Sequence, residues 1–307
     1  MAIWYQCNQR CTGCPISQNP NKHESMSYET ILQKIDELQT SIHPGEKVSV
    51  TVSGGEPTLH PDFFRIMDLF KERGFFVTLL TNAERFSNRD FALEFLKHID
   101  IRRFILVTTL HGSCAELHES QNLSVGSFIK SVEALQFLSF RGVQVSVKHC
   151  ITGINYKDTE DFIRFVDENF HPSVDIQLWG IDYSGLTKEQ AKALYVPFSE
   201  IRSYLEAALD TYLEIRSMNF RNITLNNIPL CAIDPYYWDL MPQNVDTNYL
   251  YSTYLDPTTD RQYVTDDTAK LSNRCRSCDV NEYCQGAYRS LFEYFGDDVV
   301  QEIHTID

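Results

Sequence analysis

The chain has 307 residues, 43% of them hydrophobic, which is enough for one large α/β domain and a smaller appendage. Its formal net charge of −15 disfavours a nucleic-acid partner, because an acidic surface repels a polyanion. No apolar run reaches the length of about eighteen residues that a transmembrane helix needs, so the sequence predicts no membrane partner.

The nine cysteines indicate the compartment. No signal peptide precedes Cys7, so the sequence predicts a cytoplasmic protein. Thiols stay reduced there, and closely spaced cysteines bind metal more often than they form disulfides.

Hydrophobic periodicity predicts strands and helices in alternation up to residue 216. The expected strands are residues 2–6, 47–53, 75–81, 104–110, 143–149 and 174–179. The expected helices are residues 27–42, 61–73, 89–98, 128–141, 159–170 and 199–216. Residues 180–197 are expected to form a connector with a short helix. Such alternation predicts a parallel sheet with right-handed crossovers, and ligands bind at the carboxyl ends of its strands.

The first expected strand ends at three cysteines, Cys7, Cys11 and Cys14, in the spacing C-x3-C-x2-C. A structural zinc site needs four ligands, and no fourth cysteine or histidine follows at a suitable spacing. A 4Fe–4S cluster held by three cysteines keeps one iron open for another ligand. The loop resembles the cluster-binding loop of radical SAM enzymes, in which S-adenosylmethionine (SAM) chelates that iron.

The second expected strand ends at Gly54, Gly55 and Glu56. Glycines allow close approach of the backbone to a ligand, and a carboxylate accepts from an ammonium group. The string resembles the GGE motif of the same superfamily, which binds the methionyl amino group of SAM. The alternative for these residues is a turn without a binding role. The resemblance implies an α/β fold, a six-unit partial (β/α)6 barrel. It also implies that Asn82 and Thr109 are polar contacts to SAM. The alternative role of these two residues is capping of the next turn.

Other polar residues follow the expected strands. Gly13 occupies the position at which many members of the superfamily carry an aromatic residue next to the adenine, so another group is expected to hold the adenine. His111 and His118 are candidate substrate ligands, although surface or capping roles are favoured. Cys150 is a candidate hydrogen-atom donor inside the barrel, with burial as a small apolar side chain as its alternative. Trp179 and Asp182 are candidate substrate contacts.

The last third of the chain carries four more cysteines: Cys231, Cys275, Cys278 and Cys284. Four thiolates suit zinc as well as a cluster. With the barrel before them, they resemble the twitch domain, a shortened SPASM domain that binds one auxiliary 4Fe–4S cluster. We therefore expect a radical SAM core over residues 1–220 and a small cysteine-rich cluster domain over residues 221–307, with zinc as the alternative ligand.

The resemblance implies that a 5′-deoxyadenosyl radical, made by reductive cleavage of SAM, removes a hydrogen atom from a substrate. Twitch and SPASM enzymes mostly modify peptides, and short strings here resemble the His-Xaa-Ser system maturases. These strings lie at residues 53–59, 81–82, 227–231 with Trp238, and 275–286. The expected outcome is oxidative crosslinking or epimerisation of a ribosomally made peptide.

The expected partners include a flavodoxin-type or ferredoxin-type reductant. Because the cluster loop begins at Cys7, a separate peptide-recognition protein is a further expected partner. The alternatives are a sugar or another small molecule as the substrate, and a non-enzymatic zinc scaffold.

Overall fold

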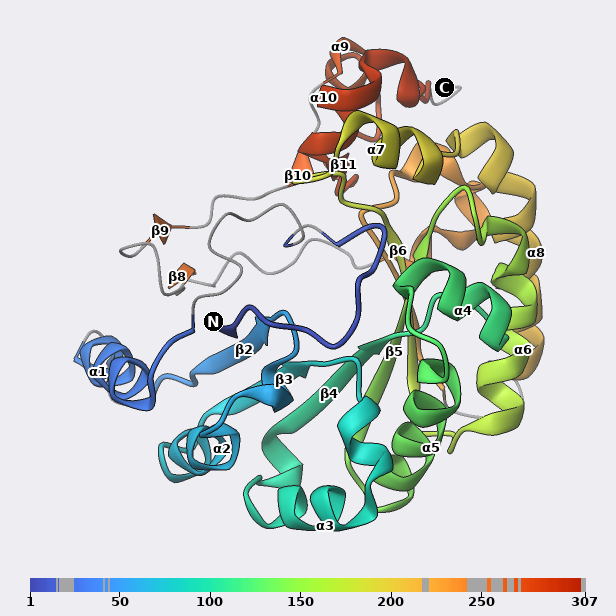
Figure 1. Ribbon diagram of the computed structural model, residues 1–307. Helices are drawn as coiled ribbons and strands as arrows, with labels where there is room; N and C mark the ends of the chain where they lie inside the picture. Colours follow the sequence, from blue (N-terminus) through green and yellow to red (C-terminus); the bar gives the residue numbers. More distant parts are fainter. Residues whose placement is uncertain are drawn as a thin grey trace.

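The computed structural model shows a twisted parallel sheet covered by helices, with a smaller C-terminal part above its carboxyl edge (Figure 1). The described residues are 1–14, 16, 25–40, 42–43, 45–216, 221–241, 253–254, 262–263, 268–269 and 272–304. None of the helices in these ranges has the length and apolar character needed to cross a membrane.

The main sheet has seven strands that lie in chain order from β1 to β7. Every neighbouring pair is parallel. The strands are β1 (Ala2–Trp4), β2 (Ser49–Gly54), β3 (Phe76–Leu80), β4 (Phe104–Thr109), β5 (Gln144–Ile151), β6 (Asp175–Gly180) and β7 (Ile223–Asn226). All seven carboxyl ends therefore meet at one edge of the sheet.

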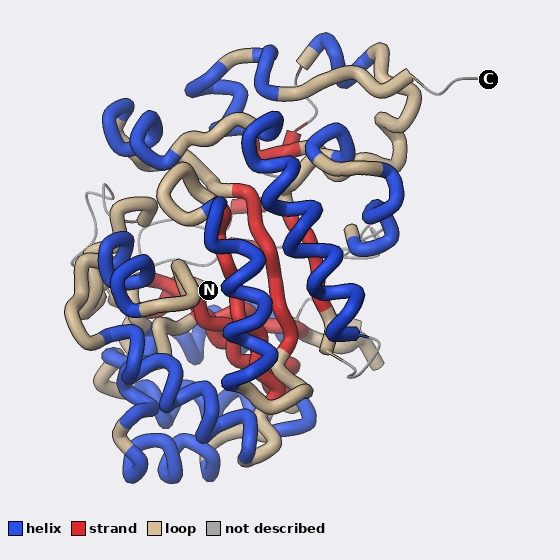
Figure 2. The backbone as a smooth tube through the Cα atoms, turned by 90° about the vertical axis from the view of Figure 1, so that its right-hand side faces the viewer, coloured by secondary structure: helices blue, strands red, loops and turns tan. Residues whose placement is uncertain are grey.

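Helices cover the outer face of the sheet, as the side view shows (Figure 2). They are α1 (Tyr28–Gln39), α2 (Phe63–Glu72), α3 (Arg89–Lys97), α4 (Ala115–Asn122), α5 (Ser127–Phe140), α6 (Thr159–Asn169) and α8 (Phe198–Arg216). The short helix α7 (Lys188–Leu194) lies in the connector after β6. The six expected strand–helix units are confirmed, and with them the six-unit partial barrel.

The two faces of the sheet differ in composition. On β5, Val145 and Val147 belong to the core under the helices, and His149 stacks on Phe162 of α6 with ring centroids 4.2 Å apart. Side chains alternate along a strand, so Lys148 and Cys150 face the interior of the partial barrel. The inner face mixes polar side chains such as Lys148 with half-exposed apolar ones, Leu80 and Ile105.

Two elements were not expected from the sequence. The strand β7 has four residues, of which only Ile223 and Leu225 are buried apolar side chains, so its pattern is too short to detect. The helix α4 buries His118, Gln121 and Asn122 instead of an apolar stripe, so helical periodicity in hydrophobicity is missing.

The C-terminal part contains short elements. They are the 3-10 helices η5 (Leu230–Ala232), η6 (Pro235–Leu240) and η7 (Asp297–Val299), the helices α9 (Asn273–Arg276) and α10 (Arg289–Phe295), and the strands β8 (Thr253–Tyr254), β9 (Gln262–Tyr263), β10 (Thr268–Ala269) and β11 (Ala287–Tyr288). Leu291 and Phe292 of α10 share a core cluster with Leu186 and Leu194 of the connector. The domain division at residue 220 stays a prediction; β7, which follows it, belongs to the main sheet.

Candidate functional site

The cysteine loop, residues 7–14, leaves β1 at the carboxyl edge of the sheet and folds back on itself. The backbone N–H of Gln9 donates to Cys7 Sγ at 3.4 Å, and the backbone N–H of Cys14 donates to Cys11 O at 3.2 Å. The Gln9 amide oxygen lies 3.6 Å from Cys11 Sγ. These local bonds curl the loop and bring its cysteines close to one another.

Burial determines the protonation of these thiols. It raises the pKa of Cys7 to about 11 and the pKa of Cys11 to about 12, and Cys14 adds a smaller electrostatic contribution to each. Mutual influence of this kind places the three sulfurs near one another. Without a metal the thiols of Cys7 and Cys11 stay protonated at neutral pH, and a positively charged metal centre is what converts such groups to thiolates.

A carboxylate beyond β3 braces the loop from one side. Glu84 Oε1 accepts from the side-chain amides of Asn8 and Gln9, both at 2.9 Å. Glu84 Oε2 lies 3.5 Å from the Lys130 ammonium of α5. Asn82 joins the same network, since its amide donates to Asn8 Oδ1 at 2.8 Å. Glu84 was not among the expected site residues, and its distance along the chain from Cys7 gave no signal.

Helix α4 braces the loop from the other side. The backbone N–H of Arg10 donates to Asn122 O at 3.0 Å, and that of Thr12 donates to Gln121 O at 2.8 Å. The connector also reaches the loop, because Gln190 Nε2 donates to Thr12 O at 3.3 Å. Gly13 lies against the connector as well: a Cβ there would meet Leu194 Cδ1 at 3.2 Å, which explains the missing aromatic side chain.

The two glycines at the end of β2 allow another backbone segment to come close, and that segment is the chain around the end of β1. A Cβ on Gly54 would lie 2.2 Å from Trp4 O, and one on Gly55 would lie 2.4 Å from Tyr5 O. The Gly55 N–H donates to Trp4 O at 2.6 Å, and the Glu56 N–H donates to Gln6 O at 2.9 Å. The glycines therefore fix the backbone that leads directly into Cys7.

The Glu56 side chain is fully buried and gathers donors from two strands. Its Oε1 accepts from the Thr58 hydroxyl at 2.6 Å and the Thr81 hydroxyl at 2.8 Å. Its Oε2 accepts from the Asn82 N–H at 2.7 Å. Burial nevertheless raises the pKa of this carboxyl group. Glu56 thus joins the ends of β2 and β3 beneath the cysteine loop, and its contact with SAM stays a prediction.

The other candidates at the carboxyl edge have different surroundings. Asn82 Oδ1 accepts from the Glu84 N–H at 3.1 Å, so the capping alternative is observed for Asn82. Thr109 ends β4 in register with Lys148 of β5. Cys150 is in register with Trp179 of β6 and close enough to Cys11 to influence its pKa. The SAM contacts of Asn82 and Thr109 stay predictions.

His118, on the helix that follows β4, is tied into the fold, while the role of His111 stays a prediction. His118 is buried, and its Nδ1 accepts from the His111 N–H at 3.1 Å. Burial lowers the pKa of His118 to about 4, so its ring is neutral at physiological pH. The favoured capping role is thus observed for His118. Asp182 is also tied to the fold, because its Oδ1 accepts from the Ser184 and Ser290 hydroxyls, each at 2.7 Å.

The four C-terminal cysteines line one pocket of about 360 Å³ between η5, α9 and α10. Backbone N–H groups point at their sulfurs: Leu230 N and Gly286 N donate to Cys284 Sγ at 3.4 and 3.3 Å, and Ile303 N donates to Cys278 Sγ at 3.4 Å. Burial raises the pKa of Cys231 to about 11, and the other three cysteines add to it electrostatically.

Within the described residues, the cysteine pocket does not contain a preformed site for a single ion. In the described part of the chain, no three His, Cys, Asp or Glu side chains close on one point as ligands of a single metal ion do. Four cysteines around one pocket, with N–H donors to sulfur, suit either a cluster or zinc, and the auxiliary cluster stays a prediction.

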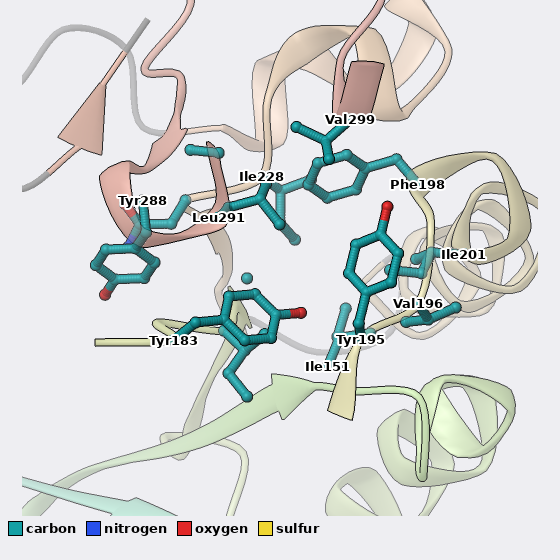
Figure 3. A pocket seen from close by; sticks show the side chains of 14 residues that line it. Ile151, Tyr183, Tyr195, Val196, Phe198, Ile201, Ile228, Tyr288, Leu291 and Val299 are labelled. Carbon is teal, nitrogen blue, oxygen red and sulfur yellow. The ribbon is translucent and has the colours of Figure 1, made fainter. Parts of the chain in front are cut away.

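A second pocket of about 490 Å³ lies between the carboxyl ends of β6 and β7 and helix α10. Its walls are mostly apolar, with Ile151, Ile228 and Leu291 among them. Tyr183 and Tyr195 also line it, as Figure 3 shows. The pocket marks the joint between the barrel and the C-terminal part.

Comparison with known proteins decides the family. Residues 1–168 match the model of the Radical SAM superfamily. The chain belongs to this superfamily. Membership implies a 4Fe–4S cluster and SAM as cofactors, and the three neighbouring thiols of residues 7–14 are of the ligand type that such a cluster takes.

Curated relatives of this radical SAM protein resemble it over the barrel. Mycofactocin maturase MftC of Mycobacterium tuberculosis (strain CDC 1551 / Oshkosh) is 30% identical over 164 residues, which are 52% of this chain and 39% of that protein. A tungsten-containing aldehyde ferredoxin oxidoreductase cofactor-modifying protein of Pyrococcus furiosus is 23% identical over 173 residues, 54% of this chain and 47% of that one. The matches thus span less than half of these relatives.

Solved structures share the fold over nearly the whole chain. Streptococcus suis SuiB bound to precursor peptide SuiA superposes with a TM-score of 0.65 at 15% identity, covering 98% of this chain and 74% of SuiB. Native anSMEcpe with bound AdoMet and Cp18Cys peptide gives a TM-score of 0.62 at 15% identity, covering 98% and 90%. At this identity the likeness concerns the fold.

Proposed function

We propose that this radical SAM protein is a maturase that abstracts a hydrogen atom from a peptide substrate. The observation that carries this proposal is the braced three-cysteine loop at the carboxyl edge of a parallel partial barrel. The curated relative MftC is named a maturase, and SuiB, which has the same fold, is described with a precursor peptide. These names support a peptide as the substrate class.

The chain's residues would position the cofactors and the substrate. Cys7, Cys11 and Cys14 would hold the cluster, and Gly54, Gly55, Glu56, Asn82 and Thr109 would surround SAM at the ends of β2, β3 and β4. When bound, the reduced cluster supplies the electron that splits SAM into methionine and a 5′-deoxyadenosyl radical. The barrel walls would keep water from the reacting carbon and fix the C–H bond.

The C-terminal cysteines would hold an auxiliary 4Fe–4S cluster. Three N–H···S hydrogen bonds stabilise thiolate sulfurs, and such bonds set the reduction potential of iron–sulfur clusters. The pocket that Cys231, Cys275, Cys278 and Cys284 line would hold this cluster, with zinc as the alternative. With four protein ligands, the cluster would have no open iron and would transfer electrons.

The first experiment counts metals after anaerobic reconstitution and measures 5′-deoxyadenosine with a reductant and SAM. About eight irons with matching sulfide and no zinc support two 4Fe–4S clusters. About four irons with one zinc would remove the auxiliary cluster from the proposal and keep the radical chemistry. No 5′-deoxyadenosine from iron-loaded protein would refute the enzymatic function and favour a zinc scaffold.

The outcome of the reaction depends on where the substrate radical goes. We infer two routes. In an oxidative crosslink, a cluster held by the four C-terminal cysteines would take up the remaining electron; in an epimerisation, the Cys150 thiol would give its hydrogen atom to the substrate radical, and the external one-electron reductant with a proton would restore the thiol. Cys150→Ala separates them when substrate products are analysed by mass spectrometry in deuterated water. An oxidative enzyme keeps its product yield, and an epimerase stops incorporating deuterium. Cys114→Ala, at the residue before α4, is the matched control and changes neither result.

A small molecule is the second candidate substrate. The cofactor-modifying relative from Pyrococcus furiosus supports it. Either substrate requires an external one-electron reductant of the flavodoxin or ferredoxin type, and a peptide would also use a separate recognition protein. A stimulation of SAM cleavage by nucleotide sugars or cofactor precursors, but not by peptides, would favour this candidate.

A further inference from the structure

Lys148 lies on the inner face of β5, two residues before Cys150. Its neighbours Val147 and His149 pack toward the helices, since Val147 is in the core and His149 stacks on Phe162. The alternation of side chains along a strand therefore directs Lys148 into the barrel interior.

The Lys148 ammonium lies over an aromatic ring and not beside an acid. Its Nζ is 3.7 Å from the centroid of the Trp179 ring. The indole N–H of Trp179 donates to Gln177 Oε1 at 3.1 Å, which fixes the ring. Within the described ranges, no carboxylate forms an ion pair with Lys148. An aromatic face attracts a cation but offers no acceptor to its N–H groups.

This arrangement contrasts with the rest of an acidic chain, in which 42 acidic residues outnumber 27 lysines and arginines. Lys97 and Lys130 each have a glutamate partner, Glu94 and Glu84. Lys148 is partly buried, so its charge has lost some of its water. An anion that enters the barrel would restore the missing electrostatic partner.

The position of Lys148 relative to the cysteine loop shows where a bound anion would lie. Cys150 is close to Cys11, and Lys148 lies two residues deeper along the strand, a distance of about 6.6 Å. On the next strand Lys148 is in register with Thr109, the last residue of β4. The Lys148 ammonium reaches back toward the carboxyl edge, because it lies over Trp179, which is in register with Cys150. A group held by Lys148 therefore lies inside the barrel near Cys150 and the cysteine loop.

We propose that Lys148 binds a carboxylate of the peptide substrate and thereby orients the peptide under the cysteine loop. The inference rests on the proposed function and adds the substrate class: a peptide with a free C-terminus or with an Asp or Glu side chain at the reacting position. A lysine, with one compact charge on a flexible stem, suits a single carboxylate group. Trp179 stabilises the ammonium from behind.

The test measures 5′-deoxyadenosine formation by the reconstituted, reduced protein with three synthetic hexapeptide pools. The first pool has free C-termini and lacks Asp and Glu, the second has amidated C-termini and contains Asp and Glu, and the third is amidated and lacks both. We expect the first or the second pool to accelerate 5′-deoxyadenosine formation above the peptide-free rate, and the third to leave it unchanged. The responding pool identifies the source of the carboxylate.

Variants then connect the response to Lys148. Lys148→Met abolishes the acceleration, and Lys148→Arg retains part of it because the charge is kept. The matched control is Lys157→Met, which removes an exposed ammonium 6 residues beyond Ile151 that also lies near a ring, that of Tyr156, at 5.5 Å. This control keeps the full acceleration. The comparison of pools on the unmodified protein needs no variant, so a poorly folded Lys148→Met protein does not block the test.

Several results would overturn the assignment. They are an equal response to the neutral pool, no response to any pool while peptide-free SAM cleavage proceeds, and an unchanged response in Lys148→Met. A higher KM for SAM, or an altered electron paramagnetic resonance signal of the reduced cluster, in peptide-free Lys148→Met would assign the lysine to the cofactors instead. If the unmodified protein forms no 5′-deoxyadenosine at all, the proposed function itself fails, and that result is distinct from the others.

Discussion

At the scale of single residues, Glu84 links the cysteine loop to the rest of the barrel. One carboxylate oxygen holds the amides of Asn8 and Gln9, the two residues that follow Cys7, and the other faces Lys130. Glu84 is buried, so these donors have little water to replace it. The loop geometry therefore depends on a side chain that binds no metal.

Glu84→Ala should release the loop and lower its iron content after reconstitution. Loss of the shared acceptor costs about 0.5–1.5 kcal/mol, because two partly buried hydrogen bonds are lost. The measurement is iron per chain and the rate of iron loss to a chelator. Glu84→Gln, which keeps one acceptor oxygen, should lose less iron. The control Glu94→Ala removes an exposed carboxylate bonded to Lys97 and should match the unmodified protein; equal iron loss in both would contradict the role of Glu84.

The buried ring of His149 leads to a prediction about how the stability of the protein depends on pH. Burial lowers the pKa of His149 to about 4 from its ordinary 6.5, so the folded state holds the ring neutral. The unfolded state binds the extra proton between pH 4 and 6.5, so stability is retained above pH 6.5 and falls as the pH drops toward 4. His149→Phe should reduce this slope by at most about 1.4 kcal/mol per pH unit. Thermal unfolding between pH 5 and 7.5 measures it, with exposed His43→Phe as the control that keeps the original slope.

At the scale of elements, the end of β2 and the chain after β1 touch without room for side chains. A Cβ on Gly55 would lie 2.4 Å from Tyr5 O and 2.5 Å from Gln6 O, both of them backbone atoms that cannot rotate away. The contact fixes the exit of the cysteine loop from the sheet. Close packing of the two backbones is thus a requirement of the site as well as of the sheet.

Gly55→Ala should separate β1 from β2 and displace Cys7. The expected loss of stability exceeds about 2 kcal/mol, in the range of overpacked sites, with a parallel fall in iron content. Urea unfolding and iron analysis measure the two effects. Gly142→Ala is the control: a Cβ there meets nothing within 4 Å, although its φ of +83° adds backbone strain. It should lose some stability and keep its iron; unchanged iron in Gly55→Ala would contradict the argument.

At the scale of the whole molecule, α10 attaches the C-terminal part to the connector after β6. Leu291 is buried there in a cluster with Leu186, Leu194 and Tyr183. Leu291→Ala should cost about 2–5 kcal/mol and loosen the four-cysteine pocket before the barrel. We expect the iron of the C-terminal site to be lost while the iron of the cysteine loop remains. Leu123→Ala, at a residue 61% exposed, should lose neither; loss of both sets of iron together in Leu291→Ala would show that the two parts unfold as one unit.

Much of this architecture was predictable because its signals are local in the sequence. The spacing of Cys7, Cys11 and Cys14 and the string Gly54–Gly55–Glu56 identify the family, and apolar runs mark six strands and their helices. The helix α4 was missed because its buried side chains, including His118 and Gln121, are polar. The strand β7 was missed because Ile223 and Leu225 are too few to form a pattern. Both elements are stable only through partners distant in the chain.

The sequence by itself determined the family, the parallel barrel and the two sets of cysteines, since each depends on residues close together in the chain. The tertiary structure alone decided that the glycines of β2 pack on the chain before Cys7, that Glu84 and α4 brace the cysteine loop, and that Lys148 lies over Trp179 without an acidic partner in the described residues. These relations join residues far apart in sequence. They depend on distances between atoms and on burial, and a local pattern of residue types predicts neither.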